Sequence, residues 1–338
     1  MKSTQRLFFL AATVISINLC CCQLGPSNEQ SNNFSEESIT SISSEPPKVK
    51  NPEFITTLPI PNDLKKDNEK KGSVHVFQYD TKIYDINGNG STTVSKKADV
   101  YLPYDYDDNE CYDVLYLMHG GGETYTYWLT QNKDTVKVLD NLFASGLVKP
   151  CIVVAPTFYT GSSSSGLMNS AATDIFQYEF RNDLVPALEE HYSTYCQEDT
   201  SPENLIKTRE HRGFAGLSMG SMTSIRSALI GCLDICAYIS SMSGGYDASD
   251  NTGELGFAKV EEVITGKFKD YPVRYWLNQN GTSDIALTPH EKMKDLILQR
   301  MDDVFEEDVN FKWIKFDRGQ HDYTSWLVGL YNTLQVFF

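Results

Sequence analysis

The motif G-L-S-M-G at 216–220 places a serine between two spaced glycines. The apolar run at 212–218 is typical of a buried strand, and 222–232 has the spacing of a helix. A serine on a tight strand-to-helix turn exposes its hydroxyl at the end of a sheet, where a nucleophile is needed. The backbone N–H of Met219, at the start of the following helix, is then placed to stabilise an oxyanion. The motif predicts acyl transfer through Ser218.

A serine hydroxyl is a weak nucleophile unless a base accepts its proton. The best candidate for this base is His321, in the loop between the last expected strand and the last expected helix. His290, at the start of a helix near Asp284, is the weaker alternative. His211 lies at the opposite end of the Ser218 strand, so we interpret it as a structural or surface residue.

The histidine needs a carboxylate that orients its ring. Asp284 fits this role because it follows the strand expected at 273–280, within a Gly-Thr-Ser loop. Asp317 and Asp322 are rivals, but they lie within a few residues of His321, where a surface or helix-capping role is favoured. The chain order serine, aspartate, histidine is the order of the catalytic triad in α/β-hydrolases.

A second donor for an oxyanion hole is expected from an earlier loop. The stretch L-M-H-G-G-G-E at 117–123 follows a central strand, and its glycines occupy 120–122. A glycine run lets a backbone N–H approach the substrate without an intervening side chain.

The elements that must position these residues alternate along the chain. Residues 73–85 and 97–103 read as a hairpin around a turn at 86–92. The alternation after it predicts an α/β-hydrolase fold, with a central, mostly parallel sheet, antiparallel N-terminal strands and helices on both faces. The expected buried strands are 112–118, 151–157, 212–218, 236–243, 273–280 and 308–316, and the expected helices are 135–147, 171–192, 222–232, 289–301 and 323–338.

Four stretches together resemble the esterase D-like enzymes of carbohydrate esterase family 1. They are ADVYLPYDYDDNECYDVLYLMHGGG, EHRGFAGLSMGS, NGTSDIA and GQHDYTSWLVGLYN. The resemblance covers about residues 70–338 and is strongest to bacterial feruloyl esterases. It implies Ser218 as nucleophile, His321 as base and Asp284 as its partner, with Met219 and Gly121 forming the oxyanion hole. Ser221 departs from the pattern, since many relatives have a third glycine there.

The substrate is expected to contact residues that follow strand ends. We expect the residues Gly122, Tyr125, Trp128, Phe158 and Tyr323 to bind it, because aromatic rings can form a slot for a planar acyl group or a platform for a sugar. The resemblance favours hydroxycinnamoyl esters on plant xylan. Acetyl xylan, other acyl sugars, siderophore esters and small thioesters are alternatives. A non-catalytic surface binding module on a hydrolase scaffold is an alternative from another class.

The net charge and the spacing of the histidines and cysteines indicate which classes of ligand are unexpected. The net charge of −16 argues against nucleic-acid binding, because an acidic surface repels phosphates. No H-E-x-x-H or C-x-x-C pair suggests a metal, and we expect neither a metal nor a cofactor. We interpret the cysteines beyond residue 22 as small buried residues with at most one disulfide; they are Cys111, Cys151, Cys196, Cys232 and Cys236.

The N-terminus has the features of an export signal. Lys2 and Arg6 precede an apolar run at 7–19, which ends at the three cysteines at 20–22. We expect a signal peptide at 1–22, either of lipoprotein type or cleaved on simple secretion. A polar, Ser-rich linker at 23–51 then leads to an esterase domain at 52–338. These features predict a secreted protein or one anchored to the cell surface, with a possible membrane tether through a lipidated cysteine.

Overall fold

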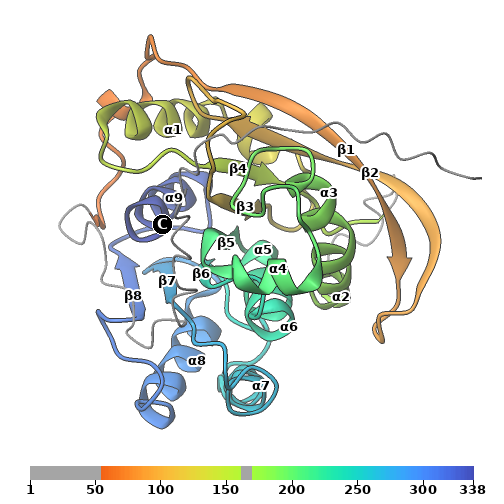
Figure 1. Cartoon of the computed structure of the whole chain (residues 1–338). Helices are drawn as coiled ribbons and strands as arrows, with labels where there is room; N and C mark the ends of the chain where they lie inside the picture. The colour runs from red at the N-terminus through yellow and green to blue at the C-terminus, as the bar shows by residue number, and fades with distance from the viewer. Residues whose placement is uncertain (1–54, 161–169) are drawn as a thin grey trace, which may run out of the picture. The chain divides into compact units, whose positions relative to one another are not determined.

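The computed structural model describes residues 55–160 and 170–338. The expected signal peptide and linker lie outside these residues. Eight strands form one sheet in the order β1-β2-β4-β3-β5-β6-β7-β8 (Figure 1). The strands are β1 (Ser73–Tyr84), β2 (Gly90–Leu102), β3 (Val114–Met118), β4 (Ile152–Ala155), β5 (Arg212–Leu217), β6 (Tyr238–Met242), β7 (Tyr275–Gly281) and β8 (Phe311–Phe316).

The sheet combines an antiparallel hairpin with six parallel strands, as expected. β1 pairs antiparallel with β2, and β2 pairs antiparallel with β4. The pairs from β4 through β3 and β5 to β8 are all parallel. The carboxyl ends of β3, β5, β7 and β8 therefore lie along one edge of the sheet, where the loops that follow them can meet.

Helices cover both faces of the sheet (Figure 1). Apolar side chains of α1 and α9 form one core layer, and those of α2, α3 and α5–α8 form the other. The α-helices are α1 (Lys133–Ser145), α2 (Ala171–Glu179), α3 (Val185–Glu189), α4 (Pro202–Lys207), α5 (Met219–Thr223), α6 (Ile230–Cys232), α7 (Glu254–Thr265), α8 (Leu287–Arg300) and α9 (Tyr323–Val336). The short 3₁₀ and π segments are η2 (Asn62–Lys65), η3 (Tyr127–Gln131), η4 (Phe180–Leu184), η5 (Arg209–His211) and η6 (Ser224–Leu229).

Several elements differ from the sequence prediction. β2 begins at Gly90 instead of residue 97, because its first half pairs with β1 alone and lies exposed beyond the rest of the sheet. The helix expected at 171–192 ends at Glu189 and contains the π segment η4. α4 and α7 were not predicted. α7 begins after a glycine without a side-chain cap and contains Gly256, and both features weaken a helix signal.

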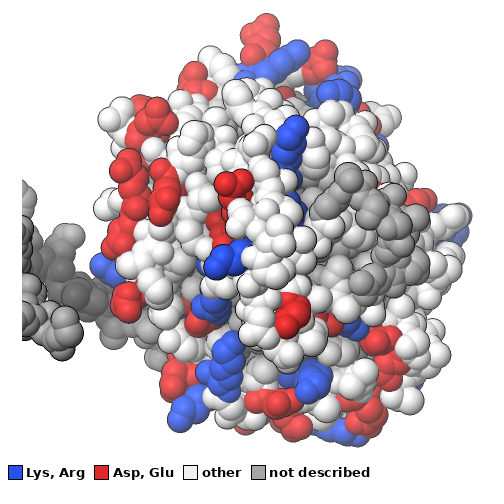
Figure 2. Space-filling model, turned by 90° about the vertical axis from the view of Figure 1, so that its right-hand side faces the viewer, with Lys and Arg blue, Asp and Glu red and all other residues white. Residues whose placement is uncertain are grey.

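The described part of the chain shows dispersed charge and reduced cysteines. Acidic and basic side chains are interspersed on the face in Figure 2. All five cysteines within the described ranges are free thiols, so the disulfide that the sequence left open is not formed among them. Over the same ranges, no helix has the length and apolarity to cross a membrane.

Candidate active site

Ser218 lies on the sharp turn between β5 and α5. Its backbone has φ 53° and ψ −118°, a region that costs energy for a residue with a side chain. Its N–H donates to the Met242 carbonyl at 2.9 Å, which ties the turn to the end of β6. The Ser218 side chain therefore stands at the carboxyl edge of the sheet, as the motif predicted.

The two glycines of the motif allow the backbone segments to touch. A Cβ added to Gly216 would lie 2.2 Å from the Gly220 carbonyl oxygen. One added to Gly220 would lie 2.4 Å from the His119 carbonyl oxygen. No side chain fits at either contact, so α5 can pack directly against the ends of β5 and β3.

Ser218, His321 and Asp284 form a hydrogen-bonded chain. His321 Nε2 lies 2.9 Å from Ser218 Oγ, and His321 Nδ1 lies 2.8 Å from Asp284 Oδ1. The carboxylate can only accept, so Nδ1 donates and Nε2 is left to accept the serine proton. The three side chains come from the loops after β5, β7 and β8.

Asp284 is held in its ionised form. Burial acts to raise its pKa, but hydrogen bonds from His321 and from the Ala286 N–H hold the pKa below its usual value. The charge that orients His321 is therefore present at neutral pH.

Two further residues, Trp326 and Ser243, lie beside the triad. The sequence analysis did not connect them with His321. The Trp326 ring lies edge-on to the His321 ring at 5.2 Å and donates its Nε1–H to Ser243 Oγ at 2.9 Å. Ser243 follows β6, so the strand-end rule that located Asp284 could also have located it.

The rival residues lie in other roles. His211 Nδ1 lies 2.6 Å from Asp113, at the amino end of β5, so its structural interpretation is confirmed. His290 is buried in α8 between two asparagine side chains, and burial lowers its pKa to about 3. Asp322 caps α9 by accepting the Ser325 N–H at 3.0 Å, as its capping interpretation predicts. Asp317 is exposed and pairs with its neighbour Arg318.

The glycine loop contributes one residue to the wall of the site. The Gly120 N–H donates to Glu123 Oε2 at 2.7 Å, and the Gly122 N–H donates to the Tyr159 hydroxyl at 3.0 Å. Gly121 lines the cavity beside Ser218, and its N–H has no hydrogen-bond partner among the described residues.

A cavity of about 640 Å³ opens beside Ser218. Its walls are mainly apolar or small, and they include Met222, Pro289 and the loop 243–249. Ile285, next to Asp284, is 85% exposed at this cavity. An exposed apolar side chain beside a reactive serine favours contact with an apolar group of a ligand.

The aromatic residues expected at the substrate do not line the cavity beside Ser218. Trp128 is fully buried and donates its indole N–H to the Met118 carbonyl. Phe158 is 3% exposed and packs on His119, and the Tyr323 hydroxyl bonds with Thr135. Trp128 and Phe158 pack beneath the loops as core, so the prediction that these two rings contact substrate is wrong. Tyr323 is half-buried, and its contact with substrate stays a prediction.

The other two expected contacts also lie outside the cavity wall. Tyr125 is half-buried and Gly122 is exposed, and neither belongs to the residues that line the cavity. Met222 and Ile285 line it instead.

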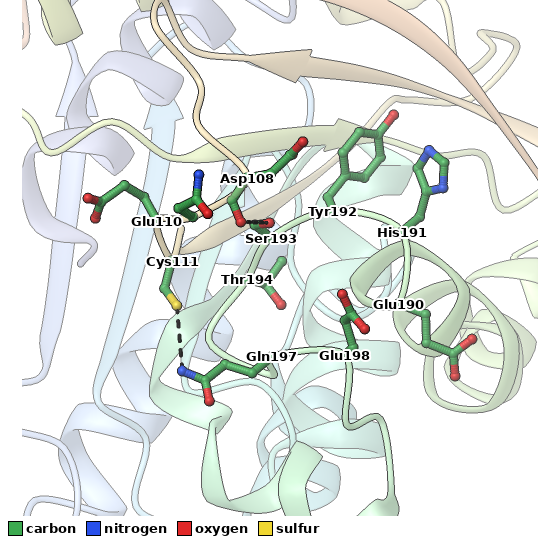
Figure 3. Close-up of a pocket in the computed structure, with 11 residues that line it drawn as sticks. Asp108, Glu110, Cys111, Glu190, His191, Tyr192, Ser193, Thr194, Gln197 and Glu198 are labelled. Carbon is green, nitrogen blue, oxygen red and sulfur yellow. Dashed lines mark hydrogen bonds between the residues drawn. The ribbon is translucent and has the colours of Figure 1, made fainter.

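A second cavity of about 470 Å³ lies at the opposite edge of the sheet, near the start of β3 (Figure 3). It is lined by residues 108–111 and by residues between 190 and 198, with several carboxylates. The Cys111 thiol faces the Gln197 amide at 3.9 Å. It shares no lining residue with the cavity beside Ser218, so the two cavities are separate. Within the described ranges, no group of three His, Cys, Asp or Glu side chains is arranged to hold a metal ion.

The chain is similar in sequence to known esterases and xylanases. A family model, Esterase, described as "Putative esterase", matches residues 91–335. Endo-1,4-beta-xylanase Y from Acetivibrio thermocellus is 41% identical over 152 residues, which are 45% of this chain and 13% of that protein. An endo-1,4-beta-xylanase/feruloyl esterase from Xylanibacter ruminicola is 34% identical over 137 residues, 39% of this chain and 17% of that protein. The matches thus span less than a fifth of these two relatives.

The structural similarity extends over most of the chain. The feruloyl esterase module from Clostridium thermocellum, solved with sinapinate, superposes with a TM-score of 0.71 at 29% identity. The match covers 83% of this chain and 93% of that module.

Proposed function

This chain belongs to the Esterase family and is a carboxylic ester hydrolase, and we propose that Ser218, His321 and Asp284 carry its reaction. The observation that supports this most directly is the hydrogen-bonded chain from Ser218 Oγ through His321 to Asp284. His321 Nε2 accepts the serine proton while Oγ attacks the ester carbonyl. It then gives this proton to the departing alcohol, and Asp284 stabilises the imidazolium between these steps.

Water completes the cycle. The acyl group is now bound to Ser218 Oγ, and His321 takes a proton from a water molecule as that water attacks the acyl carbonyl. The acyl–oxygen bond breaks, the proton returns to Ser218, and a carboxylic acid leaves.

The N–H groups of Met219 and Gly121 form the oxyanion hole in this proposal. Met219 is the first residue of α5, where N–H groups lack helical partners. The Gly120 N–H donates to Glu123 and the Gly122 N–H donates to Tyr159, which leaves Gly121 as the donor at the cavity. Two donors at the developing charge stabilise the tetrahedral intermediate.

The acyl group in this proposal is a hydroxycinnamoyl group esterified to plant xylan. The names of the related proteins support this substrate, since they include a feruloyl esterase module and a xylanase/feruloyl esterase. The apolar wall of Met222, Pro289 and Ile285 also suits a planar aromatic ring.

The first test replaces the nucleophile. Ser218→Ala should lower kcat on methyl ferulate and on 4-nitrophenyl acetate by about 10³-fold or more. Ser145→Ala, on the remote helix α1, is the control and should retain full activity. A Ser218→Ala enzyme as active as the wild type would refute the mechanism.

The second part of the test concerns the acyl group. The kcat/KM for methyl ferulate and methyl coumarate should exceed that for methyl acetate, because only the aromatic esters have a ring that can contact the apolar wall of the cavity. If ferulate reacts no faster than acetate, the hydroxycinnamoyl assignment fails and the serine mechanism stands.

The N-terminal segment supports export to the cell surface. We propose that residues 1–22 hold an export signal of lipoprotein type, and that one cysteine of 20–22 is kept on the mature chain and carries a lipid. Basic residues, an apolar run and then cysteine are the order that such a signal requires.

A further inference from the structure

We infer that Glu123 is a positioning residue that fixes the glycine loop so that the Gly121 N–H faces Ser218, an inference that rests on the proposed function. Glu123 lies two residues beyond Gly121, and its carboxylate reaches back to accept the Gly120 N–H at 2.7 Å.

The loop depends on side chains for its shape. Residues 119–122 follow β3 without joining a helix or strand. His119 Nδ1 lies 2.7 Å from the Gly120 carbonyl oxygen, which can only accept, so Nδ1 donates. His119 Nε2 therefore accepts from the Thr157 hydroxyl at 2.7 Å. Both polar groups of the Gly120 backbone are thus held by side chains.

Gly120 also packs against the nucleophile turn. A Cβ at Gly120 would lie 2.6 Å from the Leu217 side chain and 3.3 Å from Ser218 Cβ. The same Cβ would lie 3.2 Å from Glu123 Oε2. Gly120 is thus packed between the Glu123 carboxylate and the turn that carries Ser218, and this placement sets the direction of the next N–H, that of Gly121.

Glu123 also lies in the electrostatic field of the base. Burial is the largest influence on its pKa and raises it, while the Gly120 N–H, the Tyr127 hydroxyl and the charge of His321 favour the ionised form. One side chain thus accepts a hydrogen bond from the glycine loop and lies near enough to His321 for the charge of the histidine to influence its pKa.

A positioning role makes a specific kinetic prediction. A misplaced N–H weakens binding of the oxyanion, which exists only in the transition state, and leaves binding of the ground-state ester unchanged. Glu123→Ala should therefore lower kcat by about 10- to 100-fold while KM changes less than about threefold. Glu123→Gln keeps an oxygen that can accept the Gly120 N–H, so it should recover most of kcat.

The experiment compares these variants on methyl ferulate. Phenylboronic acid, which forms a tetrahedral adduct with serine, should bind Glu123→Ala more weakly by the same factor as the loss in kcat. Ferulate, the product, should bind equally to both enzymes. Glu307→Ala is the matched control, because Glu307 also accepts a backbone N–H, from Trp313, far from the site.

The outcomes separate this inference from the proposed function. If Ser218→Ala is inactive while Glu123→Ala keeps kcat within twofold of the wild type, the inference is wrong and the esterase mechanism survives. If Glu123→Ala does not fold, Glu123→Asp decides, because its shorter side chain cannot reach Gly120 and should give the same loss in kcat. Equal activity of Glu123→Asp and the wild type would also overturn the inference.

Discussion

Ser218 has a backbone conformation that the rest of the fold must impose. A positive φ of 53° costs a serine about 1–3 kcal/mol. The Met242 hydrogen bond and the backbone contacts at Gly216 and Gly220 hold the residue there. In this strained conformation the hydroxyl lies 2.9 Å from His321 Nε2. The residue that is proposed to react therefore lowers the stability of the folded protein.

His119 gives the protein a pH-dependent stability. Burial lowers its pKa to about 4, so it stays neutral in the folded protein when the unfolded chain, with a pKa of about 6.5, binds a proton. The titration of His119 therefore does not change the free energy of unfolding above about pH 6.5, and it lowers that free energy by up to roughly 3 kcal/mol as the pH falls through about 4. His119→Asn should remove this slope, up to about 1.4 kcal/mol per pH unit.

Urea unfolding of both proteins between neutral and acid pH measures the slope. His75→Asn, on exposed β1, controls for the loss of an imidazole. The prediction concerns the difference in slope, because His119→Asn can also change stability by a constant amount. Parallel curves for the wild type and His119→Asn would contradict it.

At the scale of elements, a buried ion pair connects the hairpin to α2. Lys96 on β2 and Glu179 on α2 lie 2.7 Å apart, with side chains 4% and 3% exposed. Lys96 also donates to the Thr157 carbonyl, and Tyr79 on β1 donates to Glu179. The pair therefore joins β1, β2, α2 and the segment after β4, whose Thr157 also contacts His119.

Removing one partner of this pair leaves the other charge buried. Lys96→Met should lower the free energy of unfolding by about 3–5 kcal/mol. Adding Glu179→Gln should restore much of it, because glutamine is neutral and still accepts the Tyr79 hydroxyl. Urea unfolding of the single and double variants measures this coupling, and additive losses would refute it. Lys259→Met breaks an exposed pair with Glu262 and should cost less than about 1 kcal/mol.

Elements were predictable from sequence where burial imposes a simple pattern. The parallel strands are continuous apolar runs, because helices cover both of their faces. β2 was predicted too short, because its first half is exposed and carries no such run. The π segments η4 and η6 continue helices without a change in apolar spacing that could reveal them.

The site was predictable to a similar extent. Chain order and strand ends were enough to identify Ser218, Asp284 and His321 as candidates, which the structure brings within hydrogen-bonding distance. The cavity wall was not predictable, since an aromatic residue after a strand packs as readily under a loop, as Trp128 does, as around a ligand. Glu123 likewise has no sequence signal, because its role depends on the path of the loop.

At the scale of the whole molecule, the chain enters the described domain beside its last helix. The Thr56 backbone exchanges two hydrogen bonds with the Asn332 side chain of α9, and Ile60 is buried nearby. The catalytic candidates lie at the carboxyl edge of the sheet, near the start of α9. Thr56, near the point where the described domain begins, therefore lies against α9 at Asn332, several helical turns from His321.

This arrangement makes the proposed lipid anchor testable without harming catalysis. Expressed with its N-terminus in a bacterial host, the wild-type protein should be found in the membrane fraction and should incorporate a labelled fatty acid. Replacing the three cysteines at 20–22 with alanine should abolish the label and release the protein, while kcat on methyl ferulate stays unchanged because these residues precede the domain. Replacing Cys111, an unpaired thiol within the domain, is the control and should leave the label in place. If the wild-type protein is exported without label and is found in the medium, the lipid anchor is wrong and simple secretion accounts for the signal.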